Sequence, residues 1–314
     1  MAHWTEKDIP PLAGRTAVVT GANSGLGYHA TLQLAAHGAR VVLASRDTGK
    51  AAAAADEIRR QVPEAMLEMA ELDLANLQSV RQFADTFNAS HENLDMLINN
   101  AGVMAIPQRR TADGFEMQLG TNHLGHFALT GLLLPSLLAR PGARVVTVSS
   151  NAASRGRINF DDLQSDRKYR SWGAYGQSKL ANQLFMLELD RLARQRHIDL
   201  ISAGAHPGYA ATNLQAVGPT MQGSRLMARL MDVLNRLVAQ PASRGALPEL
   251  YAATAPNVVG GEYFGPDGLL NQRGYPTRVP TAKQALDRDV ARRLWQVSEE
   301  LTGVRFELLN AAAA

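Results

Sequence analysis

The sequence contains no cysteine. This absence excludes disulfide bonds, a thiol nucleophile and every zinc site built on cysteine, and it is compatible with a reducing compartment. Long apolar runs are also missing, since no uninterrupted stretch reaches the roughly 18 residues that a membrane-spanning helix needs. The N-terminus has no basic segment followed by an apolar run, so we expect no signal peptide and predict a cytoplasmic protein without a transmembrane segment.

The chain also lacks a large excess of charge of either sign. Its 314 residues carry a formal net charge of only +3, and the arginines are scattered. No basic run therefore indicates a nucleic acid or an anionic membrane as a partner. With 46% hydrophobic and 19% charged residues, the chain is long and apolar enough to form a large buried core, as one α/β domain or as two.

What the sequence does contain is a regular alternation of strand and helix patterns. Short apolar runs rich in β-branched residues predict strands over residues 15–20, 40–44, 65–71, 94–98, 143–148, 198–203 and 261–265. Segments with helical spacing predict helices over residues 28–37, 49–62, 76–89, 111–139, 172–192, 243–253 and 287–301. This order predicts an α/β fold, with a single Rossmann-like, doubly wound parallel sheet of about seven strands flanked by helices. The domain would span residues 14–305, between tails at 1–13 and 306–314, with a helical substrate lid at about 213–245.

A glycine-rich turn follows the first predicted strand and indicates a nucleotide-binding site. It reads Gly21-Ala22-Asn23-Ser24-Gly25-Leu26-Gly27 and runs directly into a helix. Glycines let the backbone approach a pyrophosphate closely, and the N-terminus of the helix offers free N–H groups and a favourable dipole. The spacing is Gly-x-x-x-Gly-x-Gly rather than the commoner Gly-x-Gly-x-x-Gly, but its place between a strand and a helix favours a dinucleotide.

The residues after the second predicted strand bear on the choice of cofactor. An acidic side chain there would bind the ribose 2′-hydroxyl of NAD, whereas an arginine would accommodate the 2′-phosphate of NADP. This chain has Ser45 and Arg46, and Asp47 follows one position later. The pattern favours NADP(H), with NAD(H) possible. The alternative is that Arg46 is a solvated loop charge and that Asp47 turns back to the ribose.

Other candidate residues follow later strands. Asp73 lies where a strand end would meet the adenine, but it is equally suited to cap the next helix. The run Asn99-Asn100-Ala101-Gly102 offers small residues for close approach of a cofactor and amides that can pin neighbouring loops. Pro207-Gly208 marks a turn after strand six, and Thr212 would face the nicotinamide. We expect His206 to be structural.

Tyr175 and Lys179 are the candidate acid/base pair. They are four residues apart, so in a helix both side chains lie on one face. A neighbouring ammonium lowers the pKa of a phenol from about 10, and such a tyrosine can act as a general acid/base near neutral pH. Ser150, at the end of strand five, could hydrogen-bond the same substrate oxygen. Taken alone, the spacing also suits an exposed helix pair without catalytic function. His123 and His126 form no metal site, because no supporting carboxylate has the required spacing.

Together these segments resemble the short-chain dehydrogenase/reductase family over roughly residues 14–265. The motifs are Thr20 to Gly27, Asn99 to Gly102, Ser150, Tyr175 to Lys179, and Pro207-Gly208. The chain is most similar to the retinol-dehydrogenase-like branch, because it shares Ser45-Arg46-Asp47, the insertion Asn159-Phe160-Asp161-Asp162-Leu163-Gln164 and Ser178-Lys179-Leu180-Ala181-Asn182.

The resemblance implies a role for each candidate residue. Tyr175 would be the general acid/base, and Ser150 would position the substrate oxygen. Lys179 would hold the nicotinamide ribose, and Asn122, in a local distortion of its helix, would fix a water that links Lys179 to solvent. The implied cofactor-binding residues are Gly21, Asn23, Ser24, Gly25, Leu26, Gly27, Ser45, Arg46, Asp73, Leu74, Asn100, Ala101, Gly102, Tyr175, Lys179, Pro207, Gly208 and Thr212.

These observations lead to one functional hypothesis and two rivals. The first is an NADP-preferring oxidoreductase that interconverts an alcohol and its aldehyde or ketone. Its substrate would be a small, apolar molecule, because the segment 213–240 is rich in methionine and leucine and such surfaces adapt to varied apolar partners. The same composition equally suits an ordinary helix face packed on the core. The second is a dinucleotide-binding regulator with little catalysis. The third is a scaffold that forms a homodimer or homotetramer through the helices that carry Asn122 and Tyr175.

Overall fold

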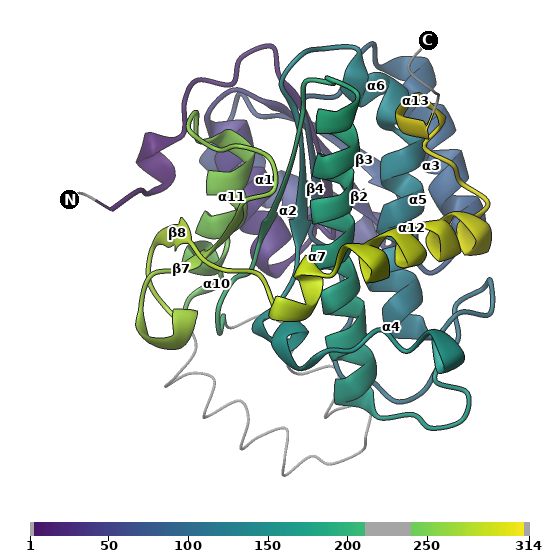
Figure 1. Ribbon diagram of the computed structural model, residues 1–314. Coiled ribbons are helices and arrows are strands. Elements are labelled where there is room, and N and C mark those ends of the chain that lie inside the picture. Colours follow the sequence, from purple (N-terminus) through teal and green to yellow (C-terminus); the bar gives the residue numbers. More distant parts are fainter. Residues whose placement is uncertain (1–2, 211–239, 311–314) are drawn as a thin grey trace.

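The computed structural model describes residues 3–210 and 240–310, so Thr212 and most of the expected lid lie outside the described residues. An eight-stranded sheet forms the centre of the molecule, with the strand order β3-β2-β1-β4-β5-β6-β7-β8 (Figure 1). Strands β1 to β7 run parallel, and β8 pairs antiparallel with β7. The strands are β1 (Thr16–Thr20), β2 (Arg40–Ser45), β3 (Met66–Glu71), β4 (Met96–Asn99), β5 (Ala143–Val148), β6 (Leu200–Ala205), β7 (Tyr263–Pro266) and β8 (Pro276–Arg278).

Helices cover both faces of this sheet, as the sequence predicted. The helices are α1 (Gly25–Ala36), α2 (Thr48–Gln61), α3 (Leu77–Ser90), α4 (Met117–Leu119), α5 (Gly125–Leu132), α6 (Leu134–Leu138), α7 (Ser171–Gln195), α10 (Ala242–Gly245), α11 (Leu247–Thr254), α12 (Arg288–Thr302) and α13 (Glu307–Asn310). Short helical turns are η1 (Glu6–Asp8), η2 (Gly120–Leu124), η3 (Asn151–Arg155), η4 (Phe160–Asp162), η5 (Leu269–Asn271) and η6 (Lys283–Leu286). Two hydrophobic clusters fill the space between the layers: α1, α2 and α11 pack on one face, and α3, α5, α6, α7 and α12 on the other.

The central strands are apolar along their whole length because both of their faces are covered. Ala17, Val18 and Val19 of β1 are all fully buried, and they alternate between the two clusters. A continuous apolar run is therefore what a parallel strand of this kind needs. The eighth strand was not predicted, because its three residues begin with Pro276 and proline is confined to strand ends and sheet edges.

The prediction of one long helix over residues 111–139 is wrong in two respects: the helix begins later, and it is interrupted. Thr111 belongs to a turn, in which its N–H donates to the Phe115 carbonyl, and the helix begins only at Met117, with Glu116 as its cap. It then widens into the π-helical turn η2 and breaks again at Leu133, just before α6, which has proline in its first turn. Proline has no N–H to continue the hydrogen-bond ladder, so a break there is expected.

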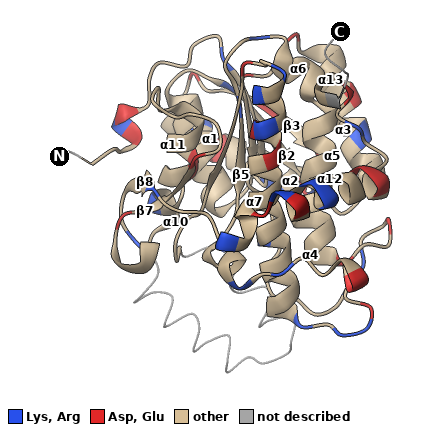
Figure 2. Cartoon of the chain, in the orientation of Figure 1, with Lys and Arg blue, Asp and Glu red and all other residues tan. Residues whose placement is uncertain are grey.

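Both ends of the described chain pack on the domain. Ile9 and Leu12 join the cluster under α1, and Phe306 and Leu309 are buried against α5 and α7. Figure 2 shows Lys and Arg interspersed with Asp and Glu over the helices and loops. None of the helices in the described segments combines the length and the apolar character that crossing a bilayer demands.

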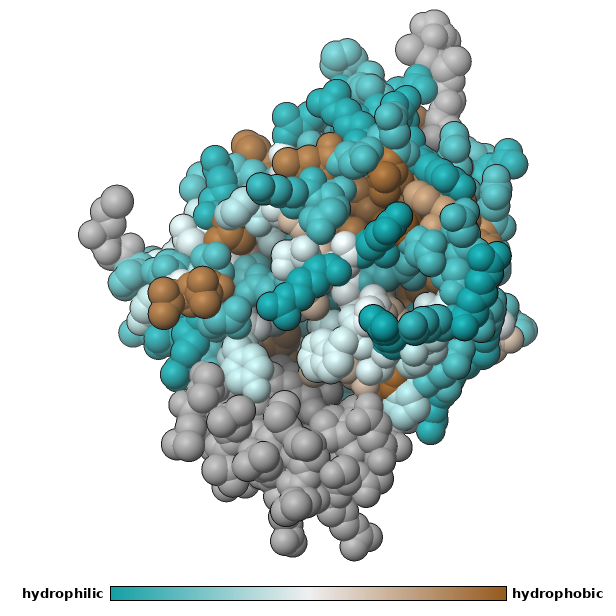
Figure 3. Space-filling view, turned by 60° about the horizontal axis from the view of Figure 1, so that its bottom comes forward, coloured by the Kyte–Doolittle hydropathy of each residue, from teal (hydrophilic) through white to brown (hydrophobic). Residues whose placement is uncertain are grey.

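The carboxyl ends of strands β1 to β6 meet at one edge of the sheet, at the bottom of Figure 1. Figure 3 turns this end toward the viewer and shows hydrophobic patches between hydrophilic side chains. In doubly wound sheets, ligands bind outside the carboxyl ends of the strands. The candidate residues that follow these strands are therefore expected to meet at this edge.

Candidate active site

Tyr175, Lys179 and Ser150 come together at the end of β5. Helix α7 begins at Ser171 and buries both Tyr175 (5% exposed) and Lys179 (3% exposed) one turn apart. Lys179 Nζ lies 5.9 Å from the centroid of the Tyr175 ring and donates a hydrogen bond of 3.1 Å to the carbonyl oxygen of Val148. Ser150 follows β5, and its side chain is close enough to the Tyr175 phenol to affect the pKa of that group. The structure therefore brings three groups from separate parts of the chain close together.

Burial dominates the ionisation of this cluster. It raises the pKa of Tyr175 to about 12, and the polar side chain of Ser150 opposes that rise. It also lowers the pKa of Lys179 to about 8. The sequence predicted a lowered pKa for Tyr175, because an ammonium stabilises a phenolate. The shift has the opposite sign because desolvation penalises the charged form of both groups.

Asn122 lies in the π-helical turn η2, at the local helix distortion that the family resemblance implies. Its Nδ2 donates to the Val103 carbonyl and to Ser178 Oγ, each at 2.9 Å, and its Oδ1 accepts from the Val103 N–H at 2.8 Å. The Asn122 side chain thus joins the loop after β4 to α7. The backbone carbonyl oxygen of Asn122 accepts a 3.0 Å hydrogen bond from His126 Nδ1. Wide turns of this kind occur frequently at functional sites.

The glycine turn has the geometry of a phosphate cradle. Gly21 and Gly25 have φ values of +66° and +56°, a region that side chains rarely adopt. A Cβ on Gly27 would lie 2.4 Å from the Gly21 carbonyl oxygen, so only glycine permits this close approach. Ser24 caps α1 in extended conformation without a side-chain hydrogen bond to the helix. The first N–H groups of α1 consequently face the turn and suit a pyrophosphate.

The loop after β4 is tied to the glycine turn through Thr20. The Asn100 and Ala101 N–H groups both donate to Thr20 Oγ1 at 2.9 Å, and Asn100 Nδ2 donates to the Thr20 carbonyl at 2.7 Å. Gly102 continues this loop toward the catalytic side. A Cβ on it would lie 3.0 Å from Asn122 Oδ1 and 3.5 Å from Lys179 Nζ. The predicted cofactor residues of this loop and the predicted catalytic residues therefore adjoin one another.

Asp47, which follows β2, caps the N-terminus of the next helix. As the N-cap of α2, its side chain accepts the Lys50 N–H at 2.9 Å and forms an ion pair of 3.2 Å with Lys50 Nζ. Ser45 Oγ donates to the Asp47 carbonyl at 3.2 Å. Arg46 is exposed beside them. Asp47 therefore serves the helix in this structure instead of turning back toward a ribose.

Asp73 lies in the turn that follows β3. Its Oδ1 accepts the Ala75 N–H at 2.9 Å, and its own N–H donates to Ser79 Oγ at 3.0 Å. The alternative interpretation of Asp73 as the cap of the next helix is wrong, because Asn76 is the N-cap of α3. Leu74 is buried against Gly125, where a Cβ would lie 2.4 Å from the Leu74 carbonyl oxygen.

The Pro207-Gly208 turn is held by buried polar side chains. Gly208 has a φ of +64°, and its N–H donates to His206 Nδ1 at 3.2 Å. His206 thus has a structural contact within the turn. The Pro207 carbonyl accepts a 2.7 Å hydrogen bond from Nε2 of the buried Gln240.

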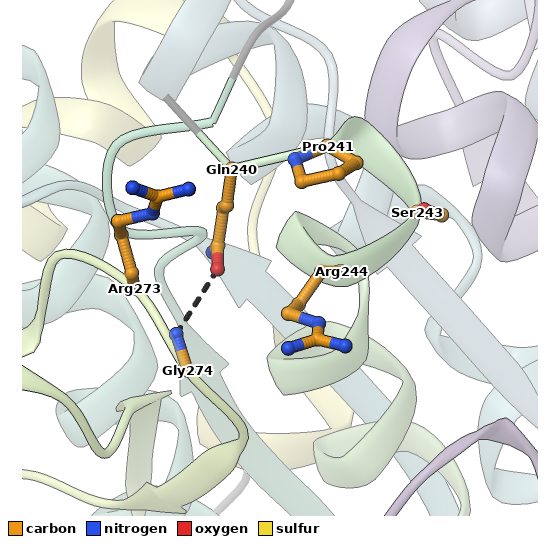
Figure 4. Close-up of a pocket in the computed structure, with 6 residues that line it drawn as sticks. All are labelled: Gln240, Pro241, Ser243, Arg244, Arg273 and Gly274. Atoms are coloured by element: carbon orange, nitrogen blue, oxygen red, sulfur yellow. Dashed lines mark hydrogen bonds between the residues drawn. The ribbon is translucent and has the colours of Figure 1, made fainter. Parts of the chain in front are cut away.

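Sequence reasoning missed two features close to this turn. The first is a cavity of about 350 Å³ lined by Gln240, Pro241, Ser243, Arg244, Arg273 and Gly274. Figure 4 shows Arg244 and Arg273 entering it from two different segments on either side of Gln240. The second is Glu249, a buried carboxylate in α11. A single acidic residue in the apolar run Leu247-Pro248-Glu249-Leu250-Tyr251 was the signal that could have revealed it.

Comparison with known proteins assigns this arrangement to a family. A model of short chain dehydrogenases matches residues 15–222. Retinol dehydrogenase 13 of Homo sapiens is 42% identical over 297 residues, which cover 93% of this chain and 86% of that protein. Retinol dehydrogenase 12 of Homo sapiens is 41% identical over 298 residues, which cover 94% of this chain and 89% of that protein.

Solved structures agree with the sequence comparison. A crystal structure of a protein from Mycobacterium paratuberculosis matches with a TM-score of 0.80 and 43% identity, and it covers 97% of this chain and 99% of that chain. A short chain dehydrogenase from Shigella flexneri, solved in complex with NADP, matches with a TM-score of 0.64 and 23% identity over 82% of this chain and 98% of that chain. The second likeness supports the fold alone. This protein belongs to the short-chain dehydrogenase/reductase family, in its retinol-dehydrogenase-like branch, and is an NAD(P)-dependent oxidoreductase that acts on CH–OH groups.

Proposed function

We propose that this protein interconverts an apolar alcohol and its aldehyde or ketone, that it prefers NADP(H), and that Tyr175 is its general acid/base. The observation that carries the proposal is the burial of Tyr175 and Lys179 one turn apart on α7, next to Ser150 at the carboxyl end of β5. The alternative of a regulator without catalysis is not favoured, because all three groups are present and adjoin one another.

The chain's own residues would handle the proton and orient the substrate. In carbonyl reduction the Tyr175 hydroxyl donates its proton to the substrate oxygen, and in alcohol oxidation the Tyr175 oxygen takes that proton back. The Ser150 hydroxyl holds the same oxygen. When bound, the nicotinamide cofactor supplies or accepts the hydride. The Lys179 ammonium has N–H donors beyond the one that Val148 accepts, and these would hold the hydroxyls of the nicotinamide ribose.

The residues at the strand ends fit such a dinucleotide. Gly21, Asn23, Ser24 and the start of α1 would hold the pyrophosphate, because the turn leaves room only for backbone and the first N–H groups of α1 face it. The loops that carry Asp73 and Asn100 would hold the adenosine end. Asn122 would fix a water between Lys179 and solvent. The role of Thr212 toward the nicotinamide stays a prediction, as it lies outside the described residues.

The preference for NADP(H) rests on two neighbouring side chains. The Asp47 carboxylate serves as the cap of α2 and pairs with Lys50, so its position does not favour recognition of a 2′-hydroxyl. The exposed Arg46 guanidinium is suited to a 2′-phosphate, because its planar set of donors matches phosphate oxygens. Ser45 fixes the loop between β2 and α2 through its bond to the Asp47 carbonyl.

The apolar character of the substrate is supported by Trp172. Its indole is 62% exposed and contacts the Tyr175 ring edge-on, with the centroids 6.0 Å apart. A large exposed apolar ring beside the acid/base indicates a surface for an apolar molecule. The relatives described above are retinol dehydrogenases, which suggests retinoids as the first compounds to test.

A panel of aldehydes and ketones, from short aliphatic to retinoid and steroid, tests this function through NADPH absorbance. Tyr175→Phe keeps the ring and removes the proton, so we expect it to lower kcat/KM by a factor of about 10² to 10⁴ with cofactor binding retained. Tyr251→Phe is the matched control, because the Tyr251 hydroxyl bonds only with Asn257 at the surface in the described structure. Unchanged reduction by Tyr175→Phe would show that the acid/base assignment is wrong.

Three further expectations remain predictions. We propose one catalytic domain over residues 14–305 with a substrate lid near 213–245, of which residues 213–239 lie outside the described part. Assembly into a homodimer or homotetramer would be measured by light scattering. A cytoplasmic location would be measured by cell fractionation.

A further inference from the structure

His126 is a buried histidine that the proton transfer outlined above does not use. It lies on α5 and is 1% exposed. Its two ring nitrogens contact segments that are far apart in the sequence: Nδ1 lies 3.0 Å from the backbone carbonyl oxygen of Asn122, and Nε2 lies 2.9 Å from Thr20 Oγ1. Thr20 ends β1 immediately before the glycine turn, and Asn122 lies in the π-helical turn η2. One imidazole therefore bridges the cofactor side and the catalytic side of the candidate site.

The partners of the imidazole define the direction of both hydrogen bonds. A carbonyl oxygen can only accept, so Nδ1 carries the proton that is donated to Asn122. Thr20 Oγ1 already accepts two N–H groups of the loop after β4, each at 2.9 Å, and these occupy both of its lone pairs. Its own proton therefore goes to Nε2, because the other acceptor within reach, the Ile98 carbonyl oxygen, lies farther away at 3.3 Å. His126 is thus a neutral imidazole in a hydrogen-bonded chain that runs from Thr20 to Asn122.

Thr20 is the residue at which the segments of the cofactor side meet. Its carbonyl accepts a 2.7 Å hydrogen bond from Asn100 Nδ2, and its hydroxyl oxygen accepts the N–H groups of Asn100 and Ala101. The next residue, Gly21, opens the glycine turn, and a Cβ on Gly27 would lie 2.6 Å from Asn100 Nδ2. A shift of the Thr20 hydroxyl therefore acts on both the loop after β4 and the turn that would hold the pyrophosphate.

Asn122 connects His126 to the segment that carries the acid/base pair. π-Helical turns are rare, and the His126 side chain contacts this one directly at the Asn122 carbonyl. The side chain of Asn122 donates to Ser178 Oγ at 2.9 Å, and Ser178 directly precedes Lys179 in α7. The imidazole consequently supports the position of Asn122, and through Asn122 the turn of α7 that carries Lys179.

His123, which lies in the same turn η2, has a different set of contacts. It is 2% exposed, and its Nε2 lies 2.9 Å from Ser298 Oγ. The Ser298 hydroxyl donates to the Leu294 carbonyl within α12 at 2.7 Å, so the His123 ring donates to Ser298. This histidine joins η2 to α12 rather than to the glycine turn. It is therefore a matched control for the loss of a buried imidazole.

We propose that His126 is a positioning residue that couples the two sides of the active site: its Nδ1–H holds Asn122, and its Nε2 holds the Thr20 hydroxyl. The first bond supports the catalytic side, and the second supports the loops expected to hold the dinucleotide. The proposal rests on the proposed function for the roles of Asn122 and Lys179. His126 acts through these neighbours, so it needs no contact with the substrate.

Substitutions that keep one of the two hydrogen bonds test this coupling. In His126→Asn the amide nitrogen lies near the place of Nδ1 and can still donate to Asn122, but the Thr20 hydroxyl loses its acceptor. In His126→Gln the amide oxygen reaches the place of Nε2 and can accept from Thr20, but the donor to Asn122 is lost. His126→Leu removes both hydrogen bonds and keeps an apolar side chain in the core.

Two measurements report the two sides of the site separately. NADPH affinity, measured by fluorescence titration, needs no turnover. We expect it to fall about tenfold in His126→Leu and His126→Asn, and to stay within about threefold of the wild type in His126→Gln. The second measurement is kcat for carbonyl reduction at saturating NADPH. We expect it to fall by about 10- to 100-fold in His126→Leu and His126→Gln, and to stay within about threefold of the wild type in His126→Asn.

His123→Leu is the control, because it removes an equally buried imidazole from the adjacent turn. It should lower Tm as His126→Leu does but keep NADPH affinity and kcat close to the wild-type values. The proposal is overturned if His126→Asn and His126→Gln change both quantities alike, or if His123→Leu reproduces the losses of His126→Leu. If His126→Leu does not fold, the comparison of His126→Asn with His126→Gln decides. If the wild type reduces no carbonyl but NADPH affinity still separates these two variants, the proposed function fails and the link between His126 and the cofactor side stands.

Discussion

Replacing Gly27 by alanine tests whether the glycine turn is a cofactor cradle set by close backbone contact. Gly27 is the third residue of α1, where alanine would ordinarily stabilise a helix by about 0.5–1 kcal/mol. Here the added Cβ would lie 2.4 Å from the Gly21 carbonyl oxygen, 2.9 Å from the Gly21 carbonyl carbon and 2.6 Å from Asn100 Nδ2. Two of these three atoms are backbone, so the turn itself has to move.

The size of the effect follows from these contacts. Extra methyl groups in a tightly packed site typically cost about 1–3 kcal/mol, so we expect Gly27→Ala to have a lower free energy of unfolding in spite of the gain in helix propensity. The shift also acts on Asn100, whose Nδ2 donates to the Thr20 carbonyl at 2.7 Å. Both loops that would hold the dinucleotide are thereby displaced, and we expect NADPH affinity to fall at least ~10-fold, a loss of about 1.4 kcal/mol.

Urea denaturation and NADPH titration by fluorescence measure the two effects separately. The matched control is Gly49→Ala in the first turn of α2, where the Cβ would meet only Asp47 Oδ1, at 3.4 Å. It should bind NADPH like the wild type and be equally or slightly more stable. Wild-type NADPH affinity in Gly27→Ala would refute the reasoning, because the contact distances leave no room for the methyl group without movement of the turn.

Three further predictions concern the cofactor, the substrate and acid stability. Arg46→Ala should lower kcat/KM with NADPH by about 10- to 100-fold and leave kcat/KM with NADH nearly unchanged, because a charge-assisted hydrogen bond to phosphate contributes about 1.5–3 kcal/mol. Equal losses with both cofactors would contradict the proposed preference for NADP(H). Trp172→Ala should raise KM for long apolar aldehydes about tenfold and leave KM for short aldehydes unchanged, because burial of an aromatic ring contributes about 1.5–3 kcal/mol. Equal effects on long and short aldehydes would contradict a contact between Trp172 and the substrate. Burial lowers the pKa of His123 to about 3 and that of His126 to about 4. The unfolded chain therefore binds more protons than the folded chain between about pH 4 and 6.5. As the pH falls through that window, each imidazole should lower the free energy of unfolding by up to about 1.4 kcal/mol per pH unit. Urea unfolding at several pH values should show a shallower slope for His126→Gln, and an unchanged slope would mean that His126 takes up no proton on unfolding.

The sequence predicted the fold and the location of the site because both depend on local patterns. The buried parallel strands are continuous apolar runs, and Gly21, Ser150 and Pro207 each follow one of them. Parallel strands of a doubly wound sheet have their carboxyl ends at one edge, so residues that follow strands meet there whatever their distance in sequence. The structure brings Ser150, Tyr175 and Lys179 together in this way.

Features that depend on tertiary packing could not be predicted. The residues around Asn122 have ordinary helical spacing, and the widening to a π-turn accompanies hydrogen bonds from Asn122 to Val103 and Ser178, which are distant in sequence. The sequence also left Asp73 open as the cap of the next helix, because several polar residues precede that helix and only the backbone conformation selects Asn76. Glu249 escaped notice because its burial depends on how α11 packs against the sheet.

The ionisation of Tyr175 shows how burial changes an argument made from neighbours alone. Proximity to Lys179 predicts a low pKa, yet burial raises it to about 12, since desolvation acts on the phenolate at full strength while the ammonium is itself destabilised. Burial also lowers the pKa of Lys179 to about 8, so the ammonium is not held strongly enough to stabilise a buried phenolate by itself. Tyr175 would then keep its proton until a further positive charge arrives, and the oxidised nicotinamide is the group that carries one. The base for alcohol oxidation would thus be active only with the oxidised cofactor in place, whereas the acid for carbonyl reduction would be ready beforehand. The pH profiles of alcohol oxidation and of carbonyl reduction therefore test whether the protein couples proton transfer to the redox state of its cofactor.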